Sequence, residues 1–450
     1  MAALPWLAMG QSPAPESGTQ PETPGAAEAP PAPARSASDG SIQTRRDARA
    51  ITQRIPAPRG QITDRAGKPL AQNKVAYLVA LQYRQFENAD RDYVVNWARV
   101  RLTALEPLVK NAVAKTDDEL WDHYRHRRWL PLYVSGHLDA KEAEKLEKQL
   151  PAGLELFPVY LRHYPENDLA AHIIGYTGVV AKMPTGPINA NEPMWEESEG
   201  RAGLEKIFDA ELTGEAGQKR IQFDEHGNLL LNEQTARPRV GGTVVTTLNL
   251  DWQRRAEAVL RKGCQRGAFV VLDVITGEVL VMASRPAFDL NLWVPRIDDA
   301  TLDKLNKDPA TPLYGRAFQS KYPPASAFKP VVALTALNNG KITSKTAIDC
   351  PAAIKIGNHF FNDWSKSARG GLTVRQALTM SNNPWFIKVG LRTGPTEFLG
   401  MARRLGMGER SGLPLIGETA GLVPDNEWML RYHKRRIMDG DTANMSIGQG

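Results

Sequence analysis

The chain has 450 residues, of which 42% are hydrophobic, and it carries a formal net charge of +6. This composition allows two or three domains with sizeable cores, and the mild basic excess comes with no nucleic-acid recognition motif, which argues against nucleic-acid binding. Two cysteines, Cys264 and Cys350, are too few for a disulfide framework or a metal cage, so we expect them to be buried thiols. No stretch supplies the ~20 consecutive apolar residues that a membrane span needs.

Residues 1–50 are rich in Pro, Ala, Ser, Gly and Glu. A segment of this composition cannot bury enough apolar surface to offset the entropy lost on ordering, so we expect a disordered, partly extended linker. The apolar start at residues 1–7 is too short for a span and lacks a basic flank.

Residues 51–243 mix short elements and bring no nucleophile, base and acid together. We expect strands over residues 76–81 and 155–159 and a charged helix over residues 140–149. Glu205 is the one residue here that resembles a catalytic acid. We expect it to make a structural salt bridge or hydrogen bond instead.

The pattern changes after residue 243. Residues 244–248 are predicted to form a strand, and Asp251 is expected to cap an amphipathic helix. The apolar residues expected on one side of this helix are Trp252, Ala256, Val259 and Leu260.

Two apolar runs, residues 268–274 and 278–282, are joined by the turn sequence Ile275-Thr276-Gly277 and predict a hairpin. The hairpin is too apolar to be exposed on both faces, so we expect it to belong to a sheet covered by helices. A hairpin followed by a helical region predicts an α+β domain with a mostly antiparallel sheet over residues 244–450.

Ser326 and Lys329 form the only S-x-x-K sequence in the chain, just after two prolines and just before the apolar run 331–337. That run is apolar on every face, so we expect a buried helix with Ser326 at its N-terminal end and Lys329 one turn on. A partly desolvated lysine there can take the serine proton, and free N–H groups at a helix start suit an oxyanion. The alternative without a catalytic role is an ordinary helix start whose lysine side chain reaches to solvent.

Ser381-Asn382-Asn383 is the only S-x-N sequence, and it lies at a break between two apolar helical segments. A hydroxyl and a carboxamide at such a break can face a cleft, Ser381 to relay a proton and Asn383 to hold a substrate amide. The alternative is a pair of capping residues for the next helix.

Together with their neighbours these motifs resemble the class B penicillin-binding proteins of the elongation group (penicillin-binding protein 2), over roughly residues 50–450. Further segments carry the resemblance: Arg59-Gly60-Gln61-Ile62-Thr63-Asp64-Arg65, His163-Tyr164-Pro165, Ala171-His172-Ile173-Ile174-Gly175-Tyr176, Gly203-Leu204-Glu205, Gly277-Glu278-Val279-Leu280-Val281, Asp363-Trp364, Glu427-Trp428 and Ile447-Gly448-Gln449-Gly450.

The resemblance implies a linker (1–50), a β-rich pedestal or dimerisation domain (51–243) and a serine transpeptidase/β-lactamase-like domain (244–450). It implies a periplasmic enzyme of the inner membrane that cross-links peptidoglycan stem peptides during elongation and is acylated by β-lactams. Its partners would be membrane proteins of the elongation machinery, including a glycosyltransferase, and not nucleic acid.

The resemblance also assigns roles to single residues. Ser326 would attack the D-Ala–D-Ala carbonyl, Lys329 would take its proton, Ser381 would relay it, and Asn383 would orient the substrate. No cofactor is implied. We expect no metal, because His123 with His126, and His359 with Asp363, are isolated pairs.

Members of the family have a membrane anchor before the pedestal and a K-T-G strand after the segment that ends here at Gly450. We therefore expect the domain 244–450 to be C-terminally incomplete. Arg392-Thr393-Gly394 is not that strand, because it ends a predicted helix. Two other functions stay open: a β-lactam-hydrolysing or β-lactam-sensing relative, and a non-catalytic scaffold of the elongation machinery.

Overall fold

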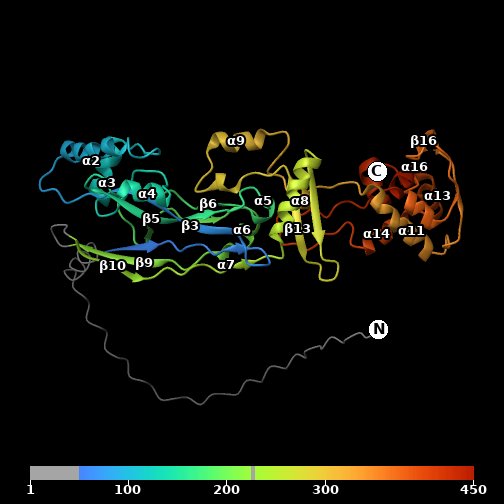
Figure 1. Cartoon of the computed structure of the whole chain (residues 1–450), viewed down its shortest axis with the longest axis horizontal. Helices are drawn as coiled ribbons and strands as arrows, with labels where there is room; N and C mark the ends of the chain where they lie inside the picture. The colour runs from blue at the N-terminus through green and yellow to red at the C-terminus, as the bar shows by residue number, and fades with distance from the viewer. Residues whose placement is uncertain (1–49, 224–228) are drawn as a thin grey trace, which may run out of the picture. The chain divides into compact units, whose positions relative to one another are not determined.

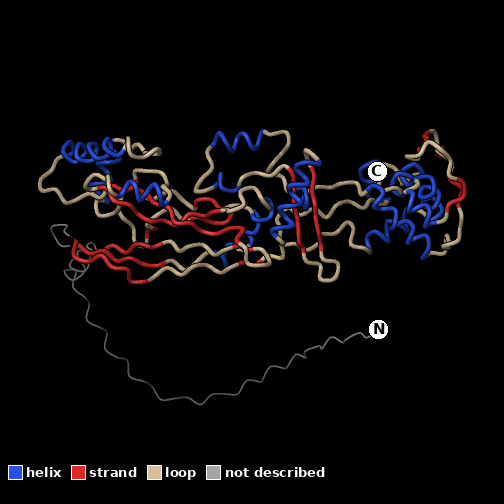
Figure 2. The backbone as a smooth tube through the Cα atoms, viewed as in Figure 1, coloured by secondary structure: helices blue, strands red, loops and turns tan. Residues whose placement is uncertain are grey.

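The computed structural model describes residues 50–223 and 229–450 (Figure 1). The linker expected over residues 1–50 thus lies outside the described residues, apart from Ala50. Figure 2 shows that the long strands all precede residue 290 and that helices dominate the rest of the chain.

The part before residue 250 combines two larger sheets with several helices. Its strands are β1 (Ala50–Ile55), β2 (Ile62–Thr63), β3 (Pro69–Leu81), β4 (Leu132–Tyr133), β5 (Leu154–His163), β6 (Thr177–Val179), β7 (Glu192–Pro193), β8 (Ser198–Gly200), β9 (Gly217–Phe223), β10 (Leu229–Ala236) and β11 (Val244–Val245). Its helices are α2 (Arg91–Leu105), α3 (Asp117–Arg127), α4 (Ala140–Glu147), α5 (Ala171–Ile174), α6 (Gly203–Ile207) and α7 (Asp209–Leu212).

One sheet has the order β10-β9-β1-β7, and the other has β11-β2-β3-β4 with β5 also paired to β3. The expected strands lie within β3 and β5, and the charged helix expected over residues 140–149 is present as α4, which ends two residues earlier. Helices α2 and α3 were not expected. They pack Val94, Ala98 and Leu120 onto Val79 and Leu81 of β3, which builds a separate core.

Glu205 has the structural role expected of it. Its side chain is fully buried, and its carboxylate accepts hydrogen bonds from Arg59 Nε at 2.7 Å and Arg162 Nε at 2.6 Å. Tyr164 Oη donates to the same carboxylate at 3.2 Å. Arg59 precedes β2 and Arg162 belongs to β5, so Glu205 binds two segments that are far apart in the sequence.

Replacing Glu205 with alanine should therefore strongly destabilise the protein, because the buried Arg162 guanidinium loses its counter-charge and the buried Arg59 guanidinium loses one of two. Arg59 keeps its ion pair with Asp209, whereas Arg162 is left without an anionic partner among the described residues. We expect a loss of about 3–5 kcal/mol in the free energy of unfolding, measured by chemical denaturation. Glu278→Ala is the control, since its ion pair with Arg65 is 3.4 Å long and well exposed, and should cost less than ~1 kcal/mol. Equal losses for the two variants would contradict this structural role.

The part after residue 250 begins with a helix and a hairpin and continues mainly as helices. Its strands are β12 (Gly267–Leu272), β13 (Val279–Arg285), β14 (Ile348–Cys350), β15 (Ala353–Ile356), β16 (His359–Asn362) and β17 (Gly370–Leu372). Its helices are α8 (Leu250–Gly263), η1 (Leu290–Trp293), α9 (Asp299–Lys307), α10 (Arg316–Gln319), η2 (Ala325–Phe328), α11 (Lys329–Asn338), α12 (Val374–Met380), α13 (Asn383–Thr393), α14 (Pro395–Arg404), α15 (Asn426–His433) and α16 (Asp439–Ser446).

Helix α8 differs from the expectation in two ways. Its N-cap is Asn249, whose side chain accepts from Trp252 N, while Asp251 lies in the first turn and pairs with Lys68. Trp252 and Val259 are exposed, because the buried face runs through Leu250, Ala256 and Leu260. The expected strand at 244–248 is reduced to the two residues of β11.

The hairpin β12–β13 forms as expected, with Gly277 in the left-handed region (φ 78°) at its turn. Helix α8 packs against β13, which is buried along most of its length. Strand β12 leaves Phe269, Val270 and Leu272 exposed. Among the described residues this sheet has two strands, and helices α8 and α10 contact both of them, so the expected covering is present but leaves much of β12 exposed.

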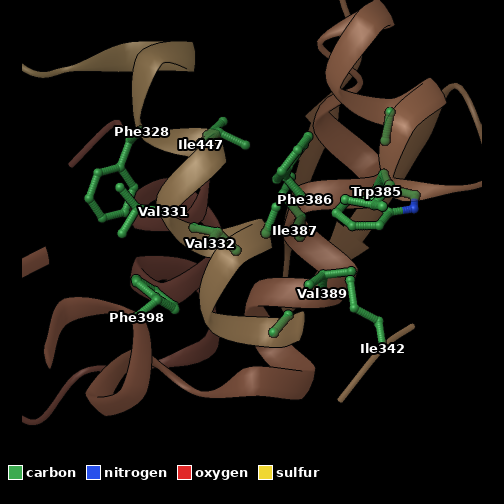
Figure 3. Packing of buried hydrophobic residues seen from close by; sticks show 14 of the residues in the cluster. Phe328, Val331, Val332, Ile342, Trp385, Phe386, Ile387, Val389, Phe398 and Ile447 are labelled. Atoms are coloured by element: carbon green, nitrogen blue, oxygen red, sulfur yellow. The ribbon is translucent and has the colours of Figure 1, made fainter. Parts of the chain in front are cut away.

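Helix α11 lies at the centre of the helical core. Figure 3 shows Val332 of α11 beside Phe386 and Ile387 of α13, all three fully buried. Leu334 and Leu337 are 47% and 38% exposed, so the expectation that every face of this helix is buried is wrong. Of the two cysteines, Cys350 is buried as expected, while Cys264 is only half-buried.

No helix in the described ranges is both long and apolar enough to cross a membrane.

Candidate active site

Ser326 lies in the short 3-10 helix η2, immediately before α11. Phe328 anchors this turn in the core, and Ala325 adopts a positive φ of 49°. Ala325 N donates to Gly448 O at 2.9 Å, which fixes the turn from outside. A Cβ on Gly448 would lie 2.0 Å from Ala325 O, so only glycine allows this approach. The segment after α16 therefore positions the backbone of Ser326.

Lys329 is the first residue of α11, and its side chain is only 2% exposed. Its Nζ donates to Ser381 O at 2.6 Å, Ser381 Oγ at 3.1 Å and Asn383 Oδ1 at 2.7 Å. Burial lowers the pKa of Lys329 to about 8, against a smaller upward effect of the Asp363 carboxylate. The amine is therefore neutral in a useful fraction of molecules near neutral pH, as a general base requires.

Ser381 lies between α12 and α13, at the break that the sequence predicted. Its backbone is left-handed, with φ 48° and ψ 40°, a conformation that costs a non-glycine residue about 1 kcal/mol. Ser381 Oγ donates to Ser326 Oγ at 3.0 Å and accepts from Lys329 Nζ. The Ser381 hydroxyl thus bridges the other two groups.

The structure brings all four predicted side chains together, but with a different connection from the one expected. We expected the Lys329 amine at the Ser326 hydroxyl. Among the hydrogen bonds of the described residues, none joins these two groups directly. The link runs through Ser381 Oγ instead: Lys329 Nζ donates to Ser381 Oγ, which donates to Ser326 Oγ. Transfer of a proton from Ser326 to a neutral Lys329 along this link requires both hydroxyls to turn toward the amine and takes two steps.

Asn383 is the first residue of α13, and Lys329 Nζ holds its Oδ1. Its Nδ2 donates to Asn362 O at 3.2 Å, so both ends of the carboxamide are oriented. The capping alternative holds for the neighbouring residue: Asn382 accepts from Trp385 N at 2.9 Å and caps α13. The S-x-N sequence therefore combines a cap with two site residues.

Sequence reasoning gave no role to Asp363 except as half of a possible metal pair. The structure places its carboxylate against Asn382 Nδ2 at 3.0 Å and Asn383 N at 2.9 Å. The family segment Asp363-Trp364 was the only other signal available from the sequence. His123, of the other pair considered, is buried with its Nε2 3.0 Å from Leu130 O.

Cavity size does not locate this site. A cavity of 780 Å³ is lined mostly by residues before 250, such as Leu78, Tyr133 and Trp195, together with Val294 and Pro295. None of the four predicted site residues lines it. The hydrogen-bonded arrangement of a hydroxyl, a relay hydroxyl and a buried amine identifies the candidate site, because this geometry matches serine acyl-transfer chemistry.

Comparisons with known proteins agree with this geometry. The penicillin binding protein transpeptidase domain matches residues 267–450, and the penicillin-binding protein dimerisation domain matches residues 54–247. The peptidoglycan D,D-transpeptidase MrdA of Acinetobacter baumannii is 30% identical over 402 residues, which cover 88% of this chain and 58% of that protein. The protein of the same name from Escherichia coli K12 is 29% identical over 409 residues, covering 88% and 62%. The chain thus spans about three-fifths of the length of these relatives.

Among solved structures, a complex between penicillin-binding protein (PBP2) and MreC from Helicobacter pylori matches with a TM-score of 0.70 at 28% identity. The match covers 89% of this chain and 74% of that one. This likeness confirms the predicted fold class, a pedestal followed by a transpeptidase-type domain. The two domain families, the sequence relatives and the fold agree: the chain belongs to the penicillin-binding proteins of the PBP2 group.

Proposed function

We propose that this chain carries the acylation site of a D-alanyl-D-alanine transpeptidase, which cross-links peptidoglycan stem peptides during cell elongation. The observation that carries the proposal is the hydrogen-bonded series Ser326 Oγ, Ser381 Oγ and Lys329 Nζ, which ends on an amine with a pKa of about 8. A series of this kind moves a proton away from a serine at neutral pH.

The reaction follows from these positions. Ser326 Oγ attacks the carbonyl carbon between the two D-Ala residues, while its proton passes through Ser381 Oγ to neutral Lys329. The same route then delivers a proton to the amine of the leaving D-Ala, because Ser381 and Lys329 stand next to the bond that breaks. An amine of a second stem peptide attacks the acyl-serine ester and restores the Ser326 hydroxyl. Asn383, held by Lys329, orients the substrate amide.

We also propose the setting of this reaction. Residues 51–243 are the pedestal, residues 244–450 belong to the transpeptidase domain, and residues 1–50 are a linker. β-Lactams acylate Ser326 as mimics of D-Ala–D-Ala, and no cofactor takes part. The protein acts at the periplasmic face of the inner membrane with membrane proteins of the elongation machinery, a glycosyltransferase among them. One neighbouring structure is a complex with MreC, and a second is described as a peptidoglycan synthase complex.

The test uses the native full-length protein and a disaccharide-pentapeptide substrate. We expect release of D-Ala and formation of cross-linked dimers in wild type, both measured by liquid chromatography with mass detection. A β-lactam should stay bound as a stable adduct. Rapid release of opened β-lactam would favour a hydrolase instead, and an absence of both D-Ala release and adduct would favour the scaffold alternative.

A further inference from the structure

The tripeptide Asn362-Asp363-Trp364, at the end of β16, holds the segment that carries Ser381 and Asn383. Four hydrogen bonds join the two segments. They are Asn382 Nδ2 to Asp363 Oδ2 (3.0 Å), Asn383 N to Asp363 Oδ1 (2.9 Å), Asn383 Nδ2 to Asn362 O (3.2 Å) and Trp364 Nε1 to Met380 O (2.8 Å). The tripeptide thus makes a direct hydrogen bond to every residue from 380 to 383 except Ser381.

Asp363 is the centre of this arrangement. Its side chain is 8% exposed, and each of its two oxygens accepts one hydrogen bond from the 380–383 segment. Within residues 50–223 and 229–450, no Lys, Arg or His lies within ion-pair distance of it. The buried charge is therefore satisfied by these two donors, and hydrogen bonds to an ionised acceptor are about twice as strong as neutral ones.

The two outer contacts fix the ends of the segment. Met380 O is a carbonyl at the C-terminal end of α12, where the helix supplies no partner, and the Trp364 indole provides one. Asn362 O orients the Asn383 carboxamide from the side opposite Lys329.

Ser381 needs such support because its backbone is left-handed. A non-glycine residue keeps this conformation only where its surroundings over-determine it. The end of α12 accepts from Ser381 N and Asn382 N, and the residues on both sides of Ser381 are held by the tripeptide, so φ and ψ of Ser381 are set by both. The direction of its Cβ, and hence the place of Oγ between Ser326 and Lys329, follows from that backbone.

We propose that residues 362–364 form a positioning element for acylation, with Asp363 as its central residue, which holds the Ser381 hydroxyl in the proton relay and the Asn383 carboxamide in its substrate-binding orientation. This inference rests on the function proposed above. Asp363 touches neither substrate nor the Ser326 hydroxyl in this arrangement, so it acts through Ser381 and Asn383.

The first variant is Asp363→Asn in the full-length protein. An asparagine keeps the shape and can accept from Asn383 N, but its amide then places an NH₂ group against the NH₂ of Asn382. We expect the rate constant of acylation by a β-lactam to fall about 100-fold, since a misplacement of about 1 Å has that effect. The dissociation constant of the non-covalent complex should change less than threefold.

The pH profile provides a readout that a merely structural role would not move. The Asp363 carboxylate raises the pKa of the Lys329 amine, so removing its charge lowers that pKa further. In Asp363→Asn the acidic limb of the acylation profile should therefore move to lower pH, although the maximum rate is reduced.

A double variant, Asp363→Asn with Asn382→Asp, tests the hydrogen bonds themselves. It exchanges carboxylate and amide: Asn at 363 donates to Asp at 382 and still accepts from Asn383 N, while Asp at 382 still caps Trp385 N. We expect the exchange to recover at least tenfold of the lost rate. Asp349→Asn is the matched control, since Asp349 is exposed and pairs only loosely with Lys388 at 3.9 Å, and it should acylate like wild type.

Each possible result of these experiments either supports or overturns the positioning element. An Asp363→Asn rate within threefold of wild type, or a double variant no faster than the single one, would overturn the positioning element. If Asp363→Asn does not fold, Trp364→Phe decides, because its side chain is 67% exposed and only the Nε1 donor is lost. A fall of about fivefold supports the proposal, and an unchanged rate overturns it. Failure of wild type to acylate on Ser326 would instead refute the proposed function.

Discussion

The variant Ser326→Ala is expected to lose covalent labelling by β-lactams completely. The hydroxyl of Ser326 is the group at the end of the relay through Ser381 to Lys329, and alanine leaves no atom that can form the acyl bond. The measurement is fluorescent β-lactam labelling of the native full-length protein, resolved on a gel, with folding followed by the thermal midpoint. Because Ser326 is exposed, the thermal midpoint should stay within a few degrees of wild type.

Ser320→Ala is the matched control for this experiment. Ser320 lies six residues earlier in the same connection, and its side chain makes no hydrogen bond among the described residues. It should label at the wild-type rate. Persistent labelling of Ser326→Ala would show that another residue is the nucleophile.

The variant Lys329→Met is expected to slow acylation by about 10³- to 10⁴-fold, the contribution that a well-placed general base makes. Methionine fills a similar volume in this nearly fully buried position, so the main loss is the amine itself. The rate constant of acylation, measured by stopped-flow or by timed labelling, checks this expectation. Lys388→Met is the control, because the Lys388 amine donates to Asp349 O away from the site and should leave the rate unchanged.

The pH dependence of wild type gives an independent check on the same base. Lys329 acts when neutral, and burial lowers its pKa to about 8. Below that pH the amine is protonated, so the acylation rate should fall about tenfold per pH unit as the pH decreases and level off above about 8. A rate independent of pH between 6 and 8, or near-normal acylation of Lys329→Met, would exclude this lysine as the base.

The sequence predicted the site residues because each of them stands at a local break. The two prolines before Ser326 and the proline after Asn383 mark helix starts, where a polar residue either caps the helix, as Asn382 does, or faces a cleft. What the sequence could not show was the connection between them. Whether Lys329 reaches Ser326 or Ser381 depends on how α11 and α13 pack, and that is decided by buried contacts such as Val332 with Phe386.

Asp363 was noticed only in a family signature and as half of an isolated metal-like pair, and Gly448 only in a family signature. Asp363 contacts residues about 20 positions further on, and Gly448 contacts Ala325 more than 120 positions back. Neither distance leaves a periodic pattern in the sequence. Their roles became visible only when the fold placed a carboxylate against a helix start and a glycine against a carbonyl.

The errors on secondary structure have similar causes. Asn249 and Asp251 are both good capping residues two positions apart, and local preference does not distinguish them. Helix α3 has almost no apolar pattern, and its buried face includes His123 and Arg127 besides Leu120 and Tyr124. Helices of this kind are stabilised by tertiary packing and capping more than by amphipathic periodicity, so the pattern did not predict one.

The most direct test of this account is to identify the acylated residue. Wild-type full-length protein is labelled with a β-lactam, digested, and analysed by tandem mass spectrometry. The account predicts one adduct, on Ser326, in the tryptic peptide that runs from Tyr322 to Lys341, because trypsin does not cleave between Lys329 and Pro330. The rate of labelling should follow deprotonation of an amine of pKa about 8. An adduct on any other residue, or a folded wild-type protein that takes no label, would contradict it.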